Sequence, residues 1–132
     1  EKNIKNYMVV TFDLNNLKMC NDNYGHSSGD AYIIHSAHII ETTFDRFGKC
    51  YRIGGDEFCC LIPDAAEFQI ERFIQKMQQD IAILNNKNII PTEVGIACGY
   101  ALATPDDADI EKVRERADEM MYHNKKVLKG LI

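Results

Sequence analysis

The amino-acid sequence predicts an α/β protein in which a central, mostly antiparallel sheet is flanked by helices. Short apolar runs of strand length alternate with longer segments whose apolar residues recur at helical spacing. In chain order, these segments form the pattern β-α-α-β-β-α-β-α. The two consecutive strands are joined through a Gly-Gly pair, as in a hairpin, and hairpin strands are antiparallel. Helices are expected to cover one or both faces of the sheet.

Length and composition are those of one globular domain. The chain has 132 residues, of which 45% are hydrophobic, and a net charge of −5. This acidic balance argues against a nucleic-acid surface, although a few lysines and a metal ion suffice to hold one nucleotide. No apolar run approaches the ~18 residues of a membrane span. Because the chain begins at Glu1, we expect an N-terminally truncated piece of a longer protein.

The cysteines indicate a reducing compartment. Their number, five, is odd, and no pair has the C-x-x-C spacing of a metal or redox site. We interpret most of them as reduced core thiols, which disfavours a zinc site. The expected location is the cytoplasm, either as a free domain or as the cytoplasmic part of a membrane-bound sensor.

The first strand is expected to run from Tyr7 to Phe12, because this apolar run is nearly continuous, as in a strand buried on both faces. Asp13 is expected to end it. A helix is expected to begin within the segment Asp13–Lys18, whose asparagines suit a helix cap. The backbone N–H groups at such a start can bind a phosphate, and Lys18 adds charge nearby. The alternative is an ordinary capped helix with a solvated lysine.

A polar segment punctuated by glycines, residues 21–30, predicts the end of this helix, a loop and the start of a second helix. The second helix is expected from about Gly29 to Arg46, where apolar residues recur on one face. Gly48 is expected to stop it. His26 is interpreted as a loop-stabilising hydrogen bonder rather than a catalyst, because no nucleophile is evident beside it.

Residues 51–62 have the pattern of a strand, a tight turn and a second strand. Gly54 and Gly55 can supply the positive φ that a two-residue hairpin turn requires. Asp56 and Glu57 then lie at the tip or at the start of the return strand, and they point to opposite faces unless the turn bends them. The alternative is an ordinary hairpin with a polar tip, since turns are rich in Gly and Asp.

The remaining elements follow from periodicity. Apolar residues from 70 to 84 recur at helical spacing and predict a third helix with one buried face. Val94 to Ala103 alternate large and small residues with period two, which predicts a strand whose small face packs closely, most simply against a helix. The last helix is expected from Ile110 to Leu128.

Together with Asp13, the hairpin carboxylates Asp56 and Glu57 suggest a site for a divalent cation. Asp13 follows the first apolar run, so two strand ends could bring Asp13, Asp56 and Glu57 together. Hard divalent cations such as Mg²⁺ need such oxygen ligands, usually completed by water and substrate phosphates. The sequence therefore predicts a metal site at one end of the sheet.

Three blocks of the sequence resemble the GGDEF domain, the diguanylate cyclase family. The blocks are Arg52-Ile53-Gly54-Gly55-Asp56-Glu57-Phe58; the segment Phe12-Asp13-Leu14-Asn15-Asn16-Leu17-Lys18 with Asn21-Asp22, Gly25-His26 and Gly29-Asp30; and Ala117-Asp118-Glu119-Met120-Met121-Tyr122 with Lys125. They occur in the family's order and cover nearly the whole chain. Residues 1–132 are thereby identified as a single GGDEF catalytic domain.

The resemblance implies a fold related to the nucleotidyl cyclases and the polymerase palm. It implies a nucleotidyltransferase that condenses two GTP molecules into the bacterial second messenger cyclic di-GMP, with release of pyrophosphate. Each domain of an antiparallel homodimer holds one GTP, and each 3′-hydroxyl attacks the α-phosphate of the opposite GTP. An upstream sensory or regulatory domain is expected as a partner. The alternative is a non-catalytic GTP-binding module that regulates an attached domain.

The resemblance also implies a metal site and a base. Two Mg²⁺ or Mn²⁺ ions per active site are expected on Asp13, Asp56 and the Leu14 carbonyl. Such ions offset charge on the triphosphate and lower the pKa of the attacking hydroxyl. Glu57 is expected to be either a second metal ligand or the base for the 3′-hydroxyl.

The expected contacts to GTP follow from the same resemblance. Asn21 and Asp30 bind the guanine edge, where a carboxylate accepts from two donors that adenine lacks, which favours GTP over ATP. Gly54 and Gly55 let the backbone approach the nucleotide closely. The phosphates contact the N–H groups near Asn16 and Leu17 and the side chains of Lys18, Lys125 and Lys129.

Two departures from the family pattern carry expectations of their own. Many members have an inhibitory product-binding site, Arg-x-x-Asp, upstream of the signature, whereas this chain has Asp45 and Gly48 at those positions. We therefore expect no feedback inhibition through that site. The Asp-x-Leu-Thr segment that usually precedes the first strand is absent from the sequence, so the excised domain is expected to dimerise poorly and turn over slowly.

Overall fold

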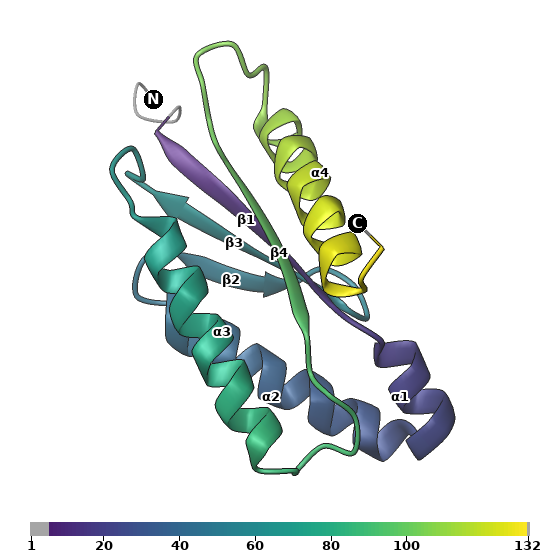
Figure 1. Ribbon diagram of the computed structural model, residues 1–132. Helices are drawn as coiled ribbons and strands as arrows, with labels where there is room; N and C mark the ends of the chain where they lie inside the picture. Colours follow the sequence, from purple (N-terminus) through teal and green to yellow (C-terminus); the bar gives the residue numbers. More distant parts are fainter. Residues whose placement is uncertain (1–5, 132) are drawn as a thin grey trace.

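The computed structural model describes residues 6–131, and that part of the chain forms four strands and four helices (Figure 1). The elements are β1 (Tyr7–Leu14), α1 (Leu17–Tyr24), α2 (His26–Phe44), β2 (Lys49–Arg52), β3 (Glu57–Pro63), α3 (Ile70–Asn86), β4 (Ile96–Leu102) and α4 (Ile110–Leu128). Their order along the chain is the predicted one.

The sheet has the order β2-β3-β1-β4, with β1 in its interior. All three pairs of neighbouring strands are antiparallel, which confirms the predicted sheet. The register places Asp13 of β1 directly opposite Glu57 of β3. The sheet thus brings together two acidic residues that lie far apart in the chain.

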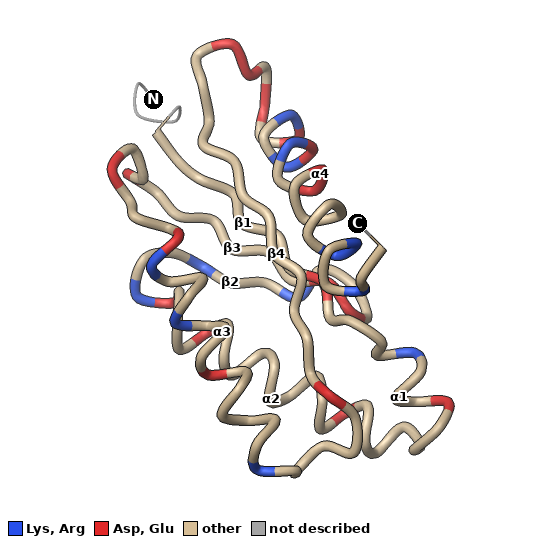
Figure 2. Tube along the Cα trace, in the orientation of Figure 1, with Lys and Arg blue, Asp and Glu red and all other residues tan. Residues whose placement is uncertain are grey.

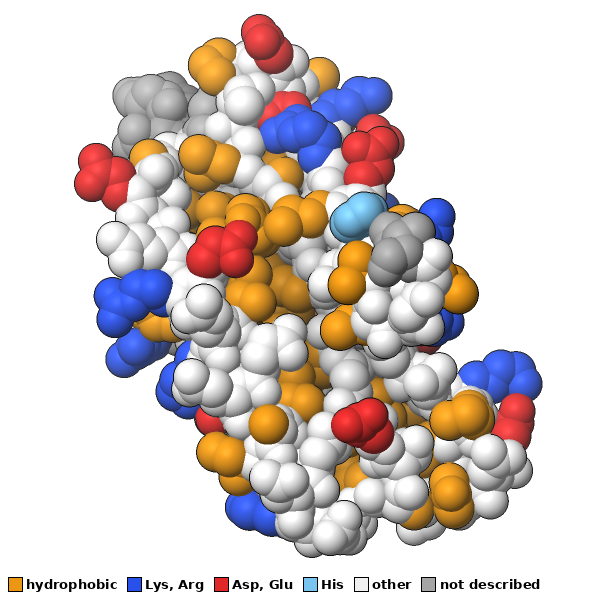
Figure 3. Space-filling view, viewed as in Figure 1, with side chains coloured by type: hydrophobic (Ala, Val, Ile, Leu, Met, Phe, Trp, Pro, Cys, Tyr) orange, Lys and Arg blue, Asp and Glu red, His pale blue; other side chains and the backbone are white. Residues whose placement is uncertain are grey.

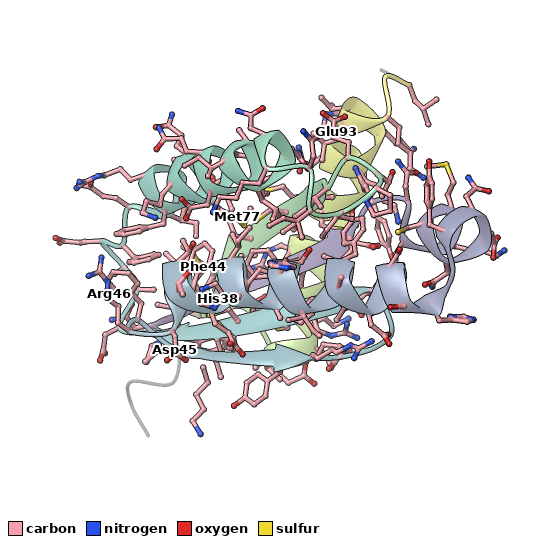
Figure 4. All side chains as sticks on the ribbon, turned by 90° about the horizontal axis from the view of Figure 1, so that it is seen from below. His38, Phe44, Asp45, Arg46, Met77 and Glu93 are labelled. Carbon is pink, nitrogen blue, oxygen red and sulfur yellow. The ribbon has the colours of Figure 1, made fainter. Side chains whose placement is uncertain are left out.

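Helices lie on both faces of this sheet (Figure 1). α2 and α3 cover one face, where alternate residues of β1 such as Val10 and Phe12 enter the larger buried cluster. Phe44 of α2 and Met77 of α3 are fully buried in this layer (Figure 4). α4 covers the other face over β1 and β4 and buries a smaller cluster that contains Val9.

β4 is an edge strand, and its small residues face α4, as predicted. A Cβ on Gly99 would overlap the backbone of Ala117 and lie 2.8 Å from the Met121 Cα. The missing side chain therefore lets α4 lie directly on the sheet. Apolar side chains also gather in the hollow between α3 and α4 (Figure 3).

Two element boundaries differ from the expected ones. β1 continues through Asp13 to Leu14, because both residues still pair with a neighbouring strand. α2 begins at His26, so that Gly25 alone, with φ of 93°, separates it from α1. The expected longer loop is replaced by a single glycine, since one left-handed residue is enough to redirect the chain.

The expected role of Gly48 as a helix stop is wrong. α2 ends at Phe44, and the φ of Gly48 is not positive. A Cβ on Gly48 would overlap the Leu61 carbonyl oxygen and lie 2.9 Å from the Ile62 Cα. The glycine is therefore needed for close approach to β3.

The expectation of reduced cysteines is met, since all five thiols are free. Three of them are buried and two are half-buried. Within residues 6–131, no helix is long and apolar enough to cross a membrane.

Candidate active site

Many of the predicted site residues lie at one end of the sheet. The β2–β3 loop, the carboxyl end of β1, the start of α1 and the C-terminal end of α4 meet there (Figure 1). Acidic residues of the loop lie beside the lysine-bearing end of α4 (Figure 2). Segments from the beginning, middle and end of the chain thus supply the charges of the site.

The β2–β3 hairpin is closed by a four-residue loop, Ile53–Asp56, and not by the predicted two-residue turn. Neither Gly54 nor Gly55 has positive φ. The longer loop is instead held by hydrogen bonds. The N–H of Ile53 donates to the Glu57 carbonyl (2.8 Å), and the Arg52 guanidinium donates to the carbonyls of both glycines (3.0 and 2.8 Å). Open space lies over both glycines, as a close-approaching ligand requires.

This loop brings the carboxylates of Asp13 and Asp56 together. Asp13 is only 3% exposed, and its carboxyl lies within interaction distance of Asp56. Burial raises the pKa of Asp13, the hydrogen bond from Lys125 opposes that rise, and the charge of Asp56 adds to it. Burial also raises the pKa of Glu57, followed by the charges of Asp13, Asp118 and Asp56. The charge of Asp56 thus acts on Asp13 from the loop, and the charge of Asp13 acts on Glu57, its partner across the β1–β3 pair.

Lys125 of α4 provides the compensating positive charge. Its Nζ donates to Asp13 Oδ2 at 2.9 Å, across 112 positions of sequence. The other oxygen, Asp13 Oδ1, is buried and has no hydrogen-bond partner within residues 6–131. A carboxylate oxygen that is desolvated and unpaired is costly unless a ligand or cation reaches it.

The donor set fits a divalent cation. Asp13 and Asp56 present carboxylate oxygens, and the N–H of Leu14 donates to the Asp56 carbonyl (2.9 Å), which ties the loop to the end of β1. In the described part of the chain, no three His, Cys, Asp or Glu side chains form a ready-made metal group. Glu57 therefore does not complete a set of three carboxylates in this structure, and a cation here would take further ligands from water and phosphate.

The start of α1 has the geometry of a phosphate site. Asn16 precedes the helix with φ of 62°, and its side chain does not cap the N–H groups of the first turn. The Leu17 side chain is buried, which anchors this turn to the core. Of the predicted phosphate lysines, Lys125 contacts the Asp13 carboxylate. Lys18 is 88% exposed and paired with Asp22 (2.8 Å), and Lys129 is exposed at the end of α4.

The two predicted guanine-binding residues come from adjacent helices. Asn21 lies on α1, and Asp30 lies on the first turns of α2 with its side chain exposed. A Cβ on Gly29 would occupy the position of Asn21 Oδ1, so this glycine makes room for the amide. Asn21 Oδ1 is buried and lacks a hydrogen-bond partner within residues 6–131. The Asn21 amide is thereby held beside the residue that precedes Asp30.

Sequence reasoning gave no role to two residues that shape this site. Arg52 braces the hairpin loop, and its place directly before the glycines was the available signal. Tyr32 of α2 is fully buried and hydrogen-bonded to both Asn15 and Gly95. Tyr32 is not among the apolar residues that predicted the buried face of this helix, so the periodicity of the sequence did not indicate its burial or its hydrogen bonds.

The positions of the family's product site lie at the far end of α2. Asp45 is the C-cap residue of α2, and Asp45 and Arg46 lie at the helix end next to Phe44 (Figure 4). Gly48 packs against β3 so closely that any side chain there would require β3 to move.

Comparison with known proteins identifies the family. A family model described as diguanylate cyclase, GGDEF domain, matches residues 1–129. Diguanylate cyclase DgcN of Escherichia coli (strain K12) is 31% identical over 123 residues, which are 92% of this chain and 30% of that protein. Signaling protein YkoW of Bacillus subtilis (strain 168) is 29% identical over 123 residues, or 89% of this chain and 15% of that protein. The chain thus spans about a third or less of the length of these relatives.

Solved structures share the fold. The GGDEF domain of DgcB from Caulobacter crescentus, solved in complex with c-di-GMP, has a TM-score of 0.80 at 23% identity, over 91% of this chain and 72% of that chain. An EAL/GGDEF domain protein from M. capsulatus has a TM-score of 0.77 at 26% identity, over 96% of this chain and 82% of that chain. Because the family model matches almost the entire sequence and the architecture agrees, the chain belongs to the diguanylate cyclase GGDEF domain family.

Proposed function

We propose that this chain is an active diguanylate cyclase domain, which condenses two GTP molecules into cyclic di-GMP and pyrophosphate. The observation that carries the proposal is the cluster of Asp13, Asp56 and Lys125 beside the start of α1. Carboxylate oxygens, a positive charge and free helix N–H groups are what a triphosphate with its cation requires. The sequence signature that supplies this cluster is intact.

Asp13 and Asp56 would hold the divalent cation, Mg²⁺ or Mn²⁺, together with the Leu14 carbonyl. A bound cation offsets the charge of the triphosphate and lowers the pKa of the attacking hydroxyl. The unpaired, buried Asp13 Oδ1 supports this assignment, because it is an oxygen that lacks the partner its burial demands. Two ions per site, as in the expected set, would also engage Glu57.

Lys125 and the start of α1 would bind the phosphates. Lys125 is paired with Asp13 at 2.9 Å, and its ammonium group would bind the β- and γ-phosphates of a nucleotide whose cation is held by Asp13. The N–H groups near Asn16 and Leu17 would add neutral donors. Lys18 and Lys129 are exposed, so they would have to turn toward a bound triphosphate.

Asn21 and Asp30 would orient the guanine. The carboxylate of Asp30 accepts from the N1–H and N2–H₂ groups, and adenine would leave it without a matching pair. Gly29 keeps the Asn21 amide in place beside it. This arrangement supports GTP over ATP as substrate.

Two domains are needed because each supplies one GTP. In each half-reaction the 3′-oxygen of one GTP bonds to the α-phosphorus of the other, and the bond from that phosphorus to pyrophosphate breaks. The hydroxyl proton passes to a base. Glu57, whose pKa is raised by burial and neighbouring carboxylates, is suited to that role or to binding a second cation.

A non-catalytic GTP-binding module is the second candidate. It is favoured by the position of Glu57, the expected base or second metal ligand, which does not complete a group of three metal-binding side chains within residues 6–131. In that case, GTP binding would regulate a domain attached to this one. Such a module would bind GTP with Mg²⁺ and release no product.

Product analysis separates these functions. Concentrated protein is incubated with GTP and Mg²⁺, in parallel with Asp56→Asn and with ATP in place of GTP. Cyclic di-GMP from the wild type alone, with a loss of about 100-fold or more in Asp56→Asn, is the expected result. Metal-dependent GTP binding without product would support the regulatory module. Absence of GTP binding would overturn the proposed site.

A further inference from the structure

We infer that Tyr32 is a positioning residue that holds the β1–α1 corner in the conformation that receives the phosphates of GTP. The corner is the segment Leu14–Leu17, which joins the last residue of β1 to the first residue of α1. This inference rests on the proposed function, because it concerns the same nucleotide site.

Tyr32, Asn15 and Gly95 form a closed ring of hydrogen bonds. The Tyr32 hydroxyl donates to the Asn15 carbonyl (2.5 Å), and the Gly95 N–H donates to the Tyr32 hydroxyl oxygen (3.0 Å). The Asn15 N–H donates to the Gly95 carbonyl (2.8 Å) and closes the ring. The Tyr32 hydroxyl also lies 3.1 Å from the Gly95 carbonyl, so its single hydrogen can be shared between the Asn15 and Gly95 carbonyls. The ring therefore ties α2, the β1–α1 corner and the segment before β4 to one another.

Two of the three residues in the ring are buried and Gly95 is half-buried, which makes the loss of the ring costly. Tyr32 is 0% exposed and Asn15 is 6% exposed. A buried polar group that loses its partner keeps the cost of its desolvation without compensation. Burial also raises the pKa of Tyr32 to about 12, so the hydroxyl stays protonated and able to donate at neutral pH.

The restraint acts directly beside the predicted phosphate contacts. Asn16 follows Asn15 and adopts φ of 62°, a left-handed conformation that costs energy and persists where its surroundings enforce it. On the other side of the corner, the Leu14 N–H donates to the Asp56 carbonyl (2.9 Å). The corner is thus fixed at two points, one on the loop that carries Asp56 and one on Tyr32.

Packing alone does not explain the hydroxyl. A phenylalanine would fill the same volume in the core, but the Asn15 carbonyl and the Gly95 N–H would both lose the hydroxyl with which they form hydrogen bonds. The expected effect of Tyr32→Phe is therefore a specific loosening of the corner. The guanine-binding residues Asn21 and Asp30 lie beyond the corner, on α1 and α2, and keep their positions.

The test is a series of ligands that differ in phosphate number. Binding of guanosine, GMP, GDP and GTP in the presence of Mg²⁺ is measured by calorimetry for the wild type, Tyr32→Phe and Thr43→Val. Thr43 is the matched control: it lies on the same helix, is 3% exposed, and its hydroxyl donates to the Ile39 carbonyl at 2.7 Å, far from the corner in sequence. We expect Tyr32→Phe to weaken GTP and GDP about tenfold and to leave guanosine unchanged. Thr43→Val should leave all four affinities unchanged.

Hydrogen exchange gives a second measurement that needs no ligand. The amide groups of Asn16 and Leu17 should exchange faster in Tyr32→Phe than in the wild type or in Thr43→Val. Equal losses for guanosine and GTP, or unchanged exchange at the corner, would overturn the inference and leave the proposed function intact. Failure of the wild type to bind GTP would overturn both.

Discussion

At the scale of single residues, the site is a balance of charge around one buried carboxylate. Asp13 is desolvated and close to Asp56, and both conditions disfavour its ionised form. Lys125 restores the balance with a hydrogen bond of 2.9 Å from a side chain that is itself 25% exposed. The balance is incomplete, because Asp13 Oδ1 remains without a partner in the described residues. A cation and a triphosphate would complete it.

Lys125→Met should reduce the affinity for GTP with Mg²⁺ by about tenfold or more, because it removes the charge that stands beside the carboxylates. Lys126→Met is the matched control, since Lys126 is the next residue and is exposed to solvent. Calorimetric titration of both variants measures the effect. Equal losses in the two variants would show that Lys125 acts only through the general charge of the helix end.

Turnover should decline on acidification, because the reaction needs Glu57 in its ionised form. The pKa of Glu57 is raised by burial and by Asp13, Asp118 and Asp56, and its ionised form is needed whether it acts as base or as ligand. The raised pKa also makes the stability of the metal-free protein depend on pH. The folded state binds the Glu57 proton more tightly than the unfolded state does, so the free energy of unfolding decreases as the pH rises through the raised pKa. Rate–pH profiles and urea titrations of the wild type and Glu57→Gln measure both effects. An unchanged acid limb in a partly active Glu57→Gln would exclude Glu57 as its source.

At the scale of elements, the site depends on how closely α4 lies on the sheet. Gly99 presents bare backbone to the helix, and Asn124 Oδ1 of α4 accepts from the Cys98 N–H at 2.9 Å. These contacts set the height of α4 above β1 and thus the reach of Lys125. The hairpin loop is positioned in a comparable way by Arg52. The packing of α4 on β4 and the hydrogen bonds from Arg52 to the hairpin loop therefore determine the geometry of the charged cluster, although neither involves a predicted substrate-binding residue.

Gly99→Ala should destabilise the fold by about 1–3 kcal/mol, because its Cβ would overlap the backbone of α4. It should also weaken GTP binding by displacing Lys125. Gly95→Ala is the control for stability: its Cβ would meet the Asn15 side chain at 3.4 Å, an ordinary contact, so a change within about 0.5 kcal/mol is expected. Urea unfolding of both variants measures the difference. A neutral Gly99→Ala would mean that α4 can move away from β4 at little cost.

At the scale of the whole molecule, one domain offers one proposed nucleotide site, and the proposed reaction needs two. The carboxylates, the start of α1 and the proposed guanine-binding residues all belong to one end of a single sheet. Nothing in this arrangement provides a second triphosphate to the same carboxylates. The proposed chemistry therefore makes activity a property of a pair of domains.

The initial rate of cyclic di-GMP formation should rise with about the square of protein concentration where the domain is mostly monomeric, since the pair is the active species. Fusion to a dimerising coiled coil should raise the rate per domain and make it linear in concentration. The same fusion with Asp56→Asn is the control and should stay inactive. A rate per domain that does not change with concentration or with fusion would contradict the requirement for a pair.

The sequence by itself determined the identity and order of the strands and helices, the family signature and the residue types of the site, because periodicity and motifs are local properties of the chain. Only the tertiary structure decided that β1 lies between β3 and β4, that Asp13 faces Glu57, and that Lys125 reaches Asp13 from 112 positions away. The hairpin turn was predicted wrongly for the same reason: hydrogen bonds from Arg52 stabilise a longer loop than Gly-Gly requires. The ring around Tyr32 joins three distant segments, and no local pattern encodes a contact of that kind.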